Sequence, residues 1–259
     1  MIKAIFFDID GTLFSHTTHS IPHSTDLALK KLKEKGILIF IATGRHKSEL
    51  KNIPLDSYHF DGYITLNGQY CYNNDGIIYE KPIEKNDILN ILEEIDHHPF
   101  PCYMINEDKM YINYLTQNVI DIQNSIASII PEVIDLKTII HKPIYQIGPF
   151  ETSPEQENRL LSKLENCQST RWHDLAIDIL HKTGGKQNGI KAILKQYNIK
   201  IDETMAFGDG NNDVEMFELV NISVAMGNAK DNLKKCATYI TDDIDNDGIY
   251  NALSHFNLI

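Results

Sequence analysis

The sequence predicts an α/β protein: a Rossmann-like, doubly wound parallel sheet interrupted by an inserted α+β domain. Two observations lead to this fold class. Near both ends of the 259-residue chain, short unbroken apolar runs, typical of strands buried on both faces of a parallel sheet, alternate with segments of helical periodicity. Over residues 82–185, short strands and two or three helices favour a compact α+β unit instead. We therefore expect a core of residues 1–81 and 186–259 and a second domain of residues 82–185.

The composition is that of an ordinary soluble protein, with 42% hydrophobic residues, 23% charged residues and a net charge of −12 at pH 7. No window approaches the ~18 apolar residues of a membrane span, and the first residues enter a strand rather than a signal peptide. The negative charge and the lack of a long basic run argue against nucleic acid or membrane partners. Cys71, Cys102, Cys167 and Cys236 form no C-x-x-C pair, so we expect reduced thiols and a cytoplasmic location.

The first core segment is expected to hold three parallel strands and a hairpin. A helix should begin at Ser24, whose side chain can cap it, and stop at Gly36. The apolar runs and the turn residues between them place the elements as follows: strand 4–7, helix 24–35, strand 37–42, strand 63–66 and hairpin 70–81.

The inserted domain and the second core segment follow in order. Helical spacing and short apolar runs in the insert predict helix 83–97, strands 102–105 and 110–115, helix 118–130, strand 145–150, helix 154–166 and strand 176–180. The return to the core predicts a helix from residue 186, strand 204–207, a helix through 214–217, strand 222–225, a short helix around 233, strand 239–240 and helix 248–253.

Several predicted strands end in polar or glycine-rich turns: Asp8-Ile9-Asp10-Gly11, Thr43-Gly44, Asn67-Gly68 and Gly208-Asp209. In a doubly wound sheet these turns gather along one edge, where ligands bind. Two neighbouring carboxylates repel each other, and a divalent cation would reverse the sign of that energy. Because the insert leaves and re-enters the core near this edge, we expect it to sit above the edge as a cap.

These spacings resemble the haloacid dehalogenase superfamily of phosphatases, and most closely its Cof-type subgroup with an α+β cap. The resemblance covers essentially the whole chain and is specific because four motifs occur in order. They are Asp8-Ile9-Asp10-Gly11-Thr12, Thr43-Gly44-Arg45, Lys186 within Gly185-Lys186-Gln187-Asn188-Gly189, and Gly208-Asp209-Gly210-Asn211-Asn212-Asp213.

The resemblance implies roles for the four acidic residues. Asp8 is the implied nucleophile, which would form an aspartyl-phosphate, and an ionised carboxylate beside Mg²⁺ is chemically suited to that role. Asp10 is the implied general acid and base, and its backbone carbonyl the usual second metal contact. Asp209 resembles the third metal ligand, and Asp213 either a ligand or an anchor that orients one. With Asp8 also on the metal, this all-oxygen set favours Mg²⁺ as the cofactor.

A second group of residues is expected to bind the phosphoryl group. Thr43 would bind through its hydroxyl, with the Gly44 amide beside it. Lys186 would neutralise charge developing on the phosphoryl group and on Asp8, from the start of a helix whose dipole adds to the effect. Asn212 is a further possible phosphate contact, with the alternative that it caps its own helix.

Substrate specificity is expected to come mainly from the cap, because the core offers only phosphate contacts. Arg45 could contact the substrate or pair with an acid of the cap, and the sequence does not choose between these. Asn67 from the core, and Asp178 and His181 beside the returning connection, are candidates for facing the active site. We interpret the histidines, His16 included, as surface residues, because none has convincing metal-binding spacing.

The sequence therefore predicts a Mg²⁺-dependent phosphatase of small phosphorylated metabolites, with sugar phosphates as the first choice. Pyridoxal phosphate or flavin mononucleotide is the alternative substrate. A phosphomutase would use the same intermediate but return the phosphoryl group to a sugar. A binding protein without turnover is a third class, which the intact motifs disfavour. The sequence indicates no oligomeric state.

Overall fold

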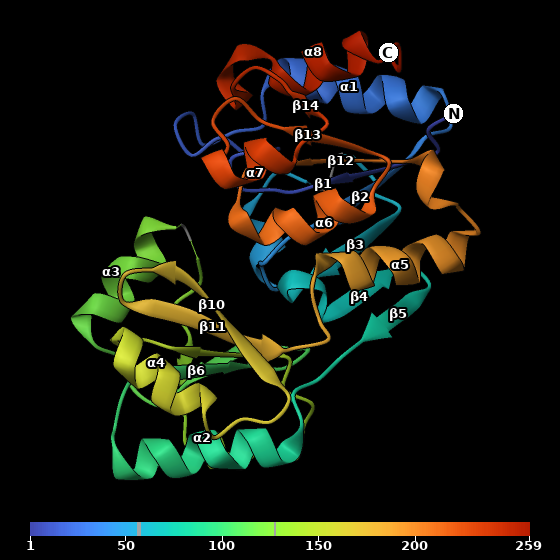
Figure 1. The fold of residues 1–259 in the computed structure, drawn as a ribbon. Coiled ribbons are helices and arrows are strands. Elements are labelled where there is room, and N and C mark those ends of the chain that lie inside the picture. The colour runs from blue at the N-terminus through green and yellow to red at the C-terminus, as the bar shows by residue number, and fades with distance from the viewer. Residues whose placement is uncertain (56–57, 127) are drawn as a thin grey trace. The chain divides into compact units, whose positions relative to one another are not determined.

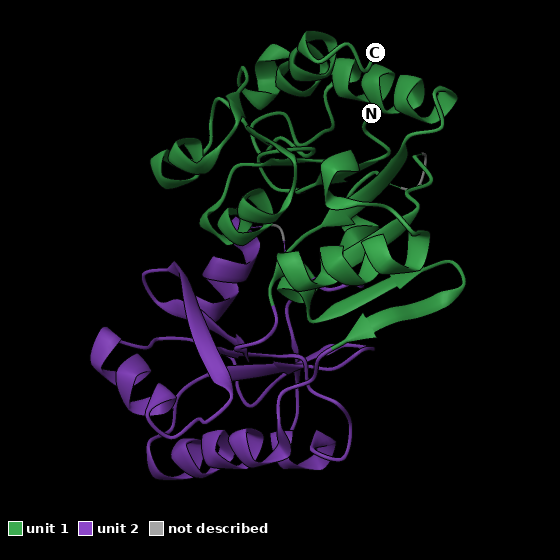
Figure 2. Ribbon diagram, turned by 45° about the vertical axis from the view of Figure 1, so that its right-hand side comes forward, with its two compact units in different colours: residues 1–45, 50–80, 185–259 green, residues 46–49, 81–184 purple. Residues whose placement is uncertain are grey.

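The computed structural model describes residues 1–55, 58–126 and 128–259. These residues divide into two compact units, which Figure 2 distinguishes by colour. Unit 1 comprises Met1–Arg45, Leu50–Glu80 and Gly185–Ile259, and unit 2 comprises His46–Glu49 and Lys81–Gly184. The bounds differ from the predicted ones by one residue at Lys81 and at Gly185. In addition, the segment His46–Glu49 clusters with unit 2, which the sequence did not indicate.

Unit 1 is built on an eight-stranded sheet with the order β14-β13-β12-β1-β2-β3-β4-β5. The first six of these strands run parallel, and β4 and β5 add an antiparallel hairpin. This arrangement confirms the predicted doubly wound α/β class. The strands are β1 (Ala4–Phe7), β2 (Leu38–Ala42), β3 (Gly62–Thr65), β4 (Tyr70–Asn73), β5 (Gly76–Glu80), β12 (Thr204–Gly208), β13 (Ile222–Ala225) and β14 (Tyr239–Ile240).

Helices cover both faces of this sheet. In Figure 1, α1 and α8 lie side by side over one face, and α5 and α6 lie over the other. Several of these helices begin directly after glycine-rich or polar turns at the strand ends. The helices of unit 1 are α1 (His23–Glu34), α5 (Lys186–Tyr197), α6 (Val214–Leu219), α7 (Asp231–Cys236) and α8 (Gly248–His255), with short 3₁₀ turns at Leu66–Gly68, Ile201–Glu203, Asn211–Asp213 and Ile244–Asn246. A further 3₁₀ turn, Glu49–Asn52, spans a boundary between the units.

The central strands are held by apolar side chains on both faces. Phe6 lies opposite Phe40 of β2, and Phe7 lies opposite Phe207 of β12. Each pair stacks with ring centroids 5.1 Å apart. Because successive side chains of a strand point to opposite faces, the two pairs anchor the core on both sides of β1. The strand that carries Asp8 at its end is therefore fixed from both sides.

Helix α1 begins one residue earlier than predicted. Pro22 occupies its N-cap position and no side-chain cap is present, so the prediction that Ser24 caps the helix is wrong. Pro22 has extended backbone, with φ −56° and ψ 143°, and the helix begins at the next residue. The predicted stop at Gly36 is confirmed: Gly36 has φ +70°, and the Ile37 amide donates to the Leu32 carbonyl beyond it.

Unit 2 has a six-stranded sheet of its own, with the order β10-β11-β9-β6-β7-β8. All its strand pairs are antiparallel except β7 with β8. One face packs an apolar core against α2 and α4. The elements are α2 (Lys85–His97), β6 (Cys102–Ile105), β7 (Met110–Ile112), α3 (Gln117–Ser125), β8 (Glu132–Val133), a 3₁₀ turn Leu136–Ile139, β9 (Gln146–Pro149), α4 (Pro154–Leu161), β10 (Cys167–His173) and β11 (Ala176–His181).

The sequence predictions were less accurate in unit 2. Helix α3 is shorter than the predicted 118–130, and Ala127 of that span lies outside the described residues. Helix α4 ends at Leu161 rather than near Asn166. Strand β10 was not predicted, because it is a mostly polar edge strand and none of its residues is fully buried. Its sequence therefore lacks the alternation that marks a half-buried strand.

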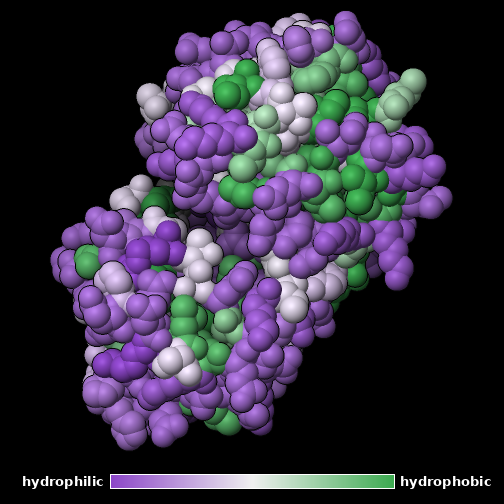
Figure 3. Space-filling model, viewed as in Figure 1, coloured by the Kyte–Doolittle hydropathy of each residue, from purple (hydrophilic) through white to green (hydrophobic). Residues whose placement is uncertain are grey.

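The surface agrees with the composition. The face drawn in Figure 3 is mainly hydrophilic, with apolar residues in separate patches. Among the described residues, we find no helix that has both the length and the apolar character needed to cross a membrane.

Candidate active site

The turn that follows β1 carries Asp8 and Asp10 and is stabilised by backbone hydrogen bonds within the turn. The amide of Asp8 donates to the carbonyl of Phe207 at 3.0 Å, which ties the strand end to β12. The carbonyl of Ile9 accepts amide hydrogen bonds from the three residues 12–14. Gly11 has φ +76°, and a Cβ there would lie 2.4 Å from Oδ2 of Asp209. Glycine is therefore required here both for the turn and for the approach of Asp209.

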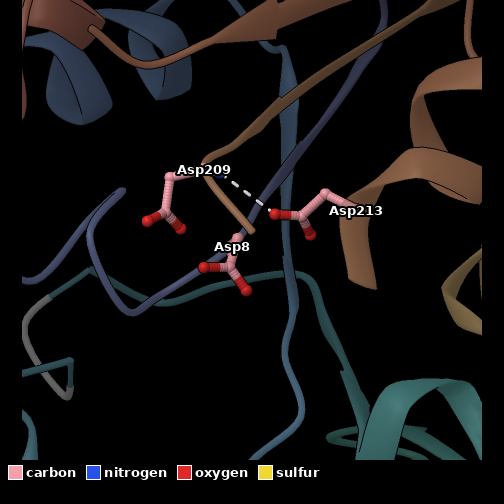
Figure 4. Close-up of side chains that lie close together, drawn as sticks. All are labelled: Asp8, Asp209 and Asp213. Carbon is pink, nitrogen blue, oxygen red and sulfur yellow. Dashed lines mark hydrogen bonds between the residues drawn. The ribbon is translucent and has the colours of Figure 1, made fainter. Parts of the chain in front are cut away.

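Asp8, Asp209 and Asp213 converge in one cluster (Figure 4). One carboxylate oxygen from each lies within 4.8 Å of the others. Oδ2 of Asp213 accepts hydrogen bonds from the amides of Asp209 and Gly210, both at 3.0 Å. Asp213 thus orients the turn that presents Asp209. Of the two roles considered for Asp213, metal ligand or anchor of a ligand, this contact favours the anchor.

The carboxylates in this cluster destabilise one another's charge. Burial raises the pKa of Asp8 well above its usual value; Lys186 opposes that shift, and the neighbouring aspartates add to it. Burial, with the charge of Asp213, raises the pKa of Asp209 to about 7. Both shifts have the direction expected when carboxylates are brought together with too little positive charge between them.

Lys186 supplies the positive charge in the cluster. It begins α5, it is only 1% exposed, and its Nζ lies 2.6 Å from Oδ1 of Asp8 and 2.6 Å from Oδ1 of Asp213. Burial alone would lower the pKa of Lys186, but the two carboxylates raise it above its ordinary value. The lysine is therefore a fixed cation beside Asp8.

Asp10 points to a different set of partners. Its carboxylate accepts two hydrogen bonds from Arg45, from Nε and Nη2, both at 2.7 Å, and lies 2.9 Å from Nε2 of His16. Burial would raise the pKa of Asp10, but the hydrogen bonds from Arg45 and His16 lower it to about 2. The same contact raises the pKa of His16. Arg45 thus pairs with an acid of unit 1, a partner that was not among the two alternatives predicted for it.

Of the residues predicted to bind phosphate besides Lys186, Thr43 and Gly44 follow β2 and Asn212 lies in the turn after β12; Asn67, predicted for specificity, follows β3. Thr43 is buried, and its Oγ1 accepts from the Arg45 amide at 3.1 Å, which leaves its hydroxyl hydrogen free to donate. Asn67 has φ +51°, and its amide donates to the Thr43 carbonyl. Asn212 donates from Nδ2 to Oδ1 of Asn67 at 3.0 Å, and a Cβ on Gly44 would lie 3.2 Å from the same oxygen. The structure therefore brings Thr43, Gly44, Asn67 and Asn212 together.

Asp178 and His181 belong to β11 of unit 2. Oδ1 of Asp178 accepts from the Tyr103 hydroxyl at 2.5 Å and from Nε1 of Trp172 at 3.0 Å. His181 is buried, and the Thr183 amide donates to its Nδ1 at 3.1 Å. Each has a local structural partner, and a role for either in specificity stays a prediction.

The buried carboxyl of Asp178 should make the stability of the protein depend on pH. Burial raises the pKa of Asp178 to about 6, although hydrogen bonds from Tyr103 and Trp172 lower it. A carboxyl whose pKa is higher in the fold than in the unfolded chain stabilises the fold while it is protonated. That stabilisation is lost as the pH rises from about 4 through about 6. Relative to Asp178→Asn, we expect the wild type to lose up to about 3 kcal/mol of unfolding free energy between about pH 4 and pH 7.

Urea unfolding followed by tryptophan fluorescence measures this, because Trp172 is the only tryptophan of the chain and contacts Asp178. Asp121→Asn, at an exposed position of α3, is the matched control. A constant difference between wild type and Asp178→Asn across this pH range would show that Asp178 stays ionised in the fold.

Two residues near the site were not predicted. His16 was interpreted as a surface residue, and it is 45% exposed in its side chain but contacts Asp10. Asn228 donates to the carbonyl of Gly11. The turn after β13 was recognised as a strand end, and the rule that such turns gather at one sheet edge could have singled out Asn228. No sequence signal distinguishes His16 from the other histidines.

The donor set suits a hard divalent cation. Three carboxylates face the single ammonium of Lys186, so the cluster carries a net charge of −2 when all are ionised. Burial first, and then the neighbouring carboxylates, raise the pKa values of Asp8 and Asp209, so their ionised forms are unfavourable without a further positive charge. Carboxylate oxygens are the ligands that Mg²⁺ prefers, so the residues fit the implied metal.

Comparisons with known proteins show the family of the chain. A family model described as haloacid dehalogenase-like hydrolase matches residues 5–253. The Bacillus subtilis (strain 168) protein YkrA, which bears the name of a phosphatase, is 34% identical over 99% of this chain and 98% of its own. The pyridoxal phosphate phosphatase YbhA of Escherichia coli (strain K12) is 26% identical over 95% of this chain and 96% of its own.

Among solved structures, the sugar phosphatase BT4131, assigned to subclass IIB of the superfamily, superposes with a TM-score of 0.88. It is 37% identical, and the match covers 99% of this chain and 100% of that one. The chain therefore belongs to the haloacid dehalogenase-like hydrolase family, as its motifs predicted. Within that family it is a phosphatase, that is, a phosphoric monoester hydrolase.

Proposed function

We propose that the protein is a Mg²⁺-dependent phosphatase that hydrolyses small phosphorylated metabolites, with sugar phosphates as the first choice, through an aspartyl-phosphate on Asp8. The observation that carries the proposal is the cluster in which the buried residues Asp8, Lys186 and Asp213 meet the half-buried Asp209. A nucleophilic carboxylate, a fixed cation and further acidic ligands are the parts that phosphoryl transfer requires.

In the first step an oxygen of Asp8 forms a bond to phosphorus, and the bond from phosphorus to the oxygen of the leaving alcohol breaks. Lys186 stabilises charge on the transferred group, because its ammonium already lies beside Asp8. Thr43 has a hydroxyl hydrogen to donate to a phosphoryl oxygen, with the Gly44 amide adjacent to it in sequence. When bound by Asp8, Asp209 and the Asp10 carbonyl, Mg²⁺ would offset the carboxylate repulsion and polarise the phosphoryl group.

In the second step water attacks the phosphorus of the aspartyl-phosphate, and phosphate leaves from Asp8. Asp10 is the base for this water. The hydrogen bonds from Arg45 and His16 hold it ionised, since they lower its pKa to about 2 against the opposing effect of burial. Before it can act as the acid for the leaving alcohol, Asp10 has to take up a proton while these contacts weaken. Arg45 and His16 would thus set the pKa of Asp10, the acid–base residue.

Two relatives support different substrates. The solved neighbour at 37% identity is named a sugar phosphatase, which favours sugar phosphates. The relative at 26% identity is named a pyridoxal phosphate phosphatase, which keeps that cofactor as the second candidate. The free thiols at the four cysteines support a cytoplasmic location, and the net charge of −12 supports a small-molecule partner rather than nucleic acid or membrane.

Phosphate release by the purified protein, measured over a panel of phosphorylated sugars, nucleotides and cofactors, tests the proposal. We expect release in Mg²⁺, loss of release in EDTA, and recovery when Mg²⁺ is returned in excess. Conversion of a sugar phosphate to an isomer without free phosphate would contradict hydrolysis and indicate a mutase. Release that is unaffected by EDTA would contradict the metal requirement.

A further inference from the structure

The loop Met226–Lys230, which follows β13, donates hydrogen bonds to two backbone carbonyls near the acidic cluster, those of Gly11 and Asp209. Asn228 donates from Nδ2 to the carbonyl of Gly11 at 2.8 Å. The amide of Lys230 donates to the carbonyl of Asp209 at 2.9 Å. One short loop therefore holds both the turn that carries Asp10 and the backbone of Asp209.

The orientation of the Asn228 amide is determined by its other partner. Its Oδ1 accepts a hydrogen bond from the backbone amide of Ile244 at 3.0 Å. Because a backbone amide can only donate, the oxygen must face Ile244 and the NH₂ group must face the Gly11 carbonyl. The loop is itself tied to the same C-terminal segment, since the Gly227 amide donates to the Asp242 carbonyl at 3.0 Å. Asn228 is thus a directed link between Gly11 and residues 242–244.

Gly11 is the part of the turn that most needs such a link. Its φ of +76° lies in a region that glycine enters easily, and glycine also leaves it easily because it has no side chain to restrict it. Its own amide donates to the Phe14 carbonyl at 3.0 Å, which holds one side of the residue. On the other side, the Gly11 carbonyl is held by Asn228. Because a Cβ on Gly11 would lie 2.4 Å from Oδ2 of Asp209, any shift of Gly11 changes the space available to that carboxylate.

We propose that Asn228 is a positioning residue that holds the Gly11 turn against Asp209 and thereby sets the spacing of the ligands that would bind Mg²⁺. Asn228 acts through the Gly11 carbonyl and takes no part in the chemical steps. The inference rests on the proposed function, because it assumes that the cluster binds a divalent cation. Hydrogen bonds that orient metal ligands typically change metal affinity by about 10- to 100-fold.

The test is Asn228→Leu, which has nearly the same shape, adds no charge and removes both the donor to Gly11 and the acceptor of the Ile244 amide. We expect the Mg²⁺ dissociation constant, measured by calorimetry on the full chain without substrate, to rise by about tenfold or more. The melting temperature in EDTA, compared with that of the control Asn221→Leu, reports how much stability the variant loses independently of the metal. Asn221 also donates from an exposed amide to a backbone carbonyl of unit 1, that of Asp202 at 3.1 Å, but has no contact with the Gly11 turn.

The outcomes separate this inference from the proposed function. If the wild type binds Mg²⁺ and Asn228→Leu binds it equally tightly, the positioning role is wrong and the phosphatase proposal stands. If the wild type binds no Mg²⁺, the metal requirement fails and the positioning role fails with it. A lower melting temperature with an unchanged dissociation constant would show that Asn228 serves stability alone. Should Asn228→Leu fail to fold, Asn228→Ser, which is too short to span the same gap, gives the same comparison.

Discussion

Asp8→Asn is expected to abolish phosphate release, with kcat lower by a factor on the order of 10³ or more. The amide has the shape of the carboxylate but lacks the negative charge that makes it a nucleophile toward phosphorus. The end of β1 should not move, because the strand is fixed by the aromatic pairs on both faces and by the hydrogen bond from the Asp8 amide to the Phe207 carbonyl. Steady-state assays in saturating Mg²⁺ measure the effect, with the substrate that the panel identifies.

Thermal unfolding in EDTA is the control for this variant. Asp8 lies beside Asp209 and Asp213, and its replacement by a neutral amide relieves repulsion between them. Lys186 keeps Asp213 as a partner. We therefore expect the metal-free variant to unfold at the same temperature as the wild type or higher. Turnover by Asp8→Asn at a rate within tenfold of the wild type would exclude Asp8 as the nucleophile.

Lys186→Met is expected to lose both stability and activity. The ammonium lies 2.6 Å from carboxylate oxygens of Asp8 and Asp213 and is buried with them. Removing one partner of a buried ion pair leaves uncompensated charge, which typically destabilises a protein by about 3–5 kcal/mol. Removing a fixed positive group from the transferring phosphoryl group should lower kcat by about 10²- to 10³-fold. Urea unfolding in EDTA and steady-state kinetics measure the two effects.

Two comparisons sharpen this prediction. Lys191→Met, at an exposed position of the same helix, should leave both stability and kcat near wild-type values. Saturating Mg²⁺ should restore part of the lost stability of Lys186→Met, because a divalent cation in the same cluster can replace the missing positive charge. A Lys186→Met variant as stable as Lys191→Met in EDTA would mean that Asp8 and Asp213 do not need the ammonium.

The core strands of unit 1 were predictable because each one is a short apolar run that stops at a polar turn. Asp8, Lys186, Asp209 and Asp213 could be chosen from those turns and from the motif spacing, and the structure brings their side chains into one cluster. The geometry of a doubly wound sheet explains this success, since parallel strands place their carboxyl ends at the same edge.

The contacts of long side chains were not predictable in the same way. Arg45 follows β2 and Asp10 follows β1, so the topology places them near each other but does not decide which partner the guanidinium selects. The same holds for Asn228, whose role depends on one amide hydrogen bond to a backbone carbonyl. Strand β10 was missed for a different reason: an edge strand with mostly polar residues carries no periodic apolar signal.

The most direct measurement of the central claim is chemical trapping of the intermediate. During turnover with Mg²⁺, rapid denaturation followed by borohydride reduction converts an aspartyl-phosphate to homoserine, which peptide mapping by mass spectrometry can locate. We predict homoserine at position 8, dependent on substrate and absent when substrate is omitted. Sustained phosphate release with no homoserine at Asp8, under conditions that trap a control acyl phosphate, would contradict covalent catalysis by this residue and require direct attack by water.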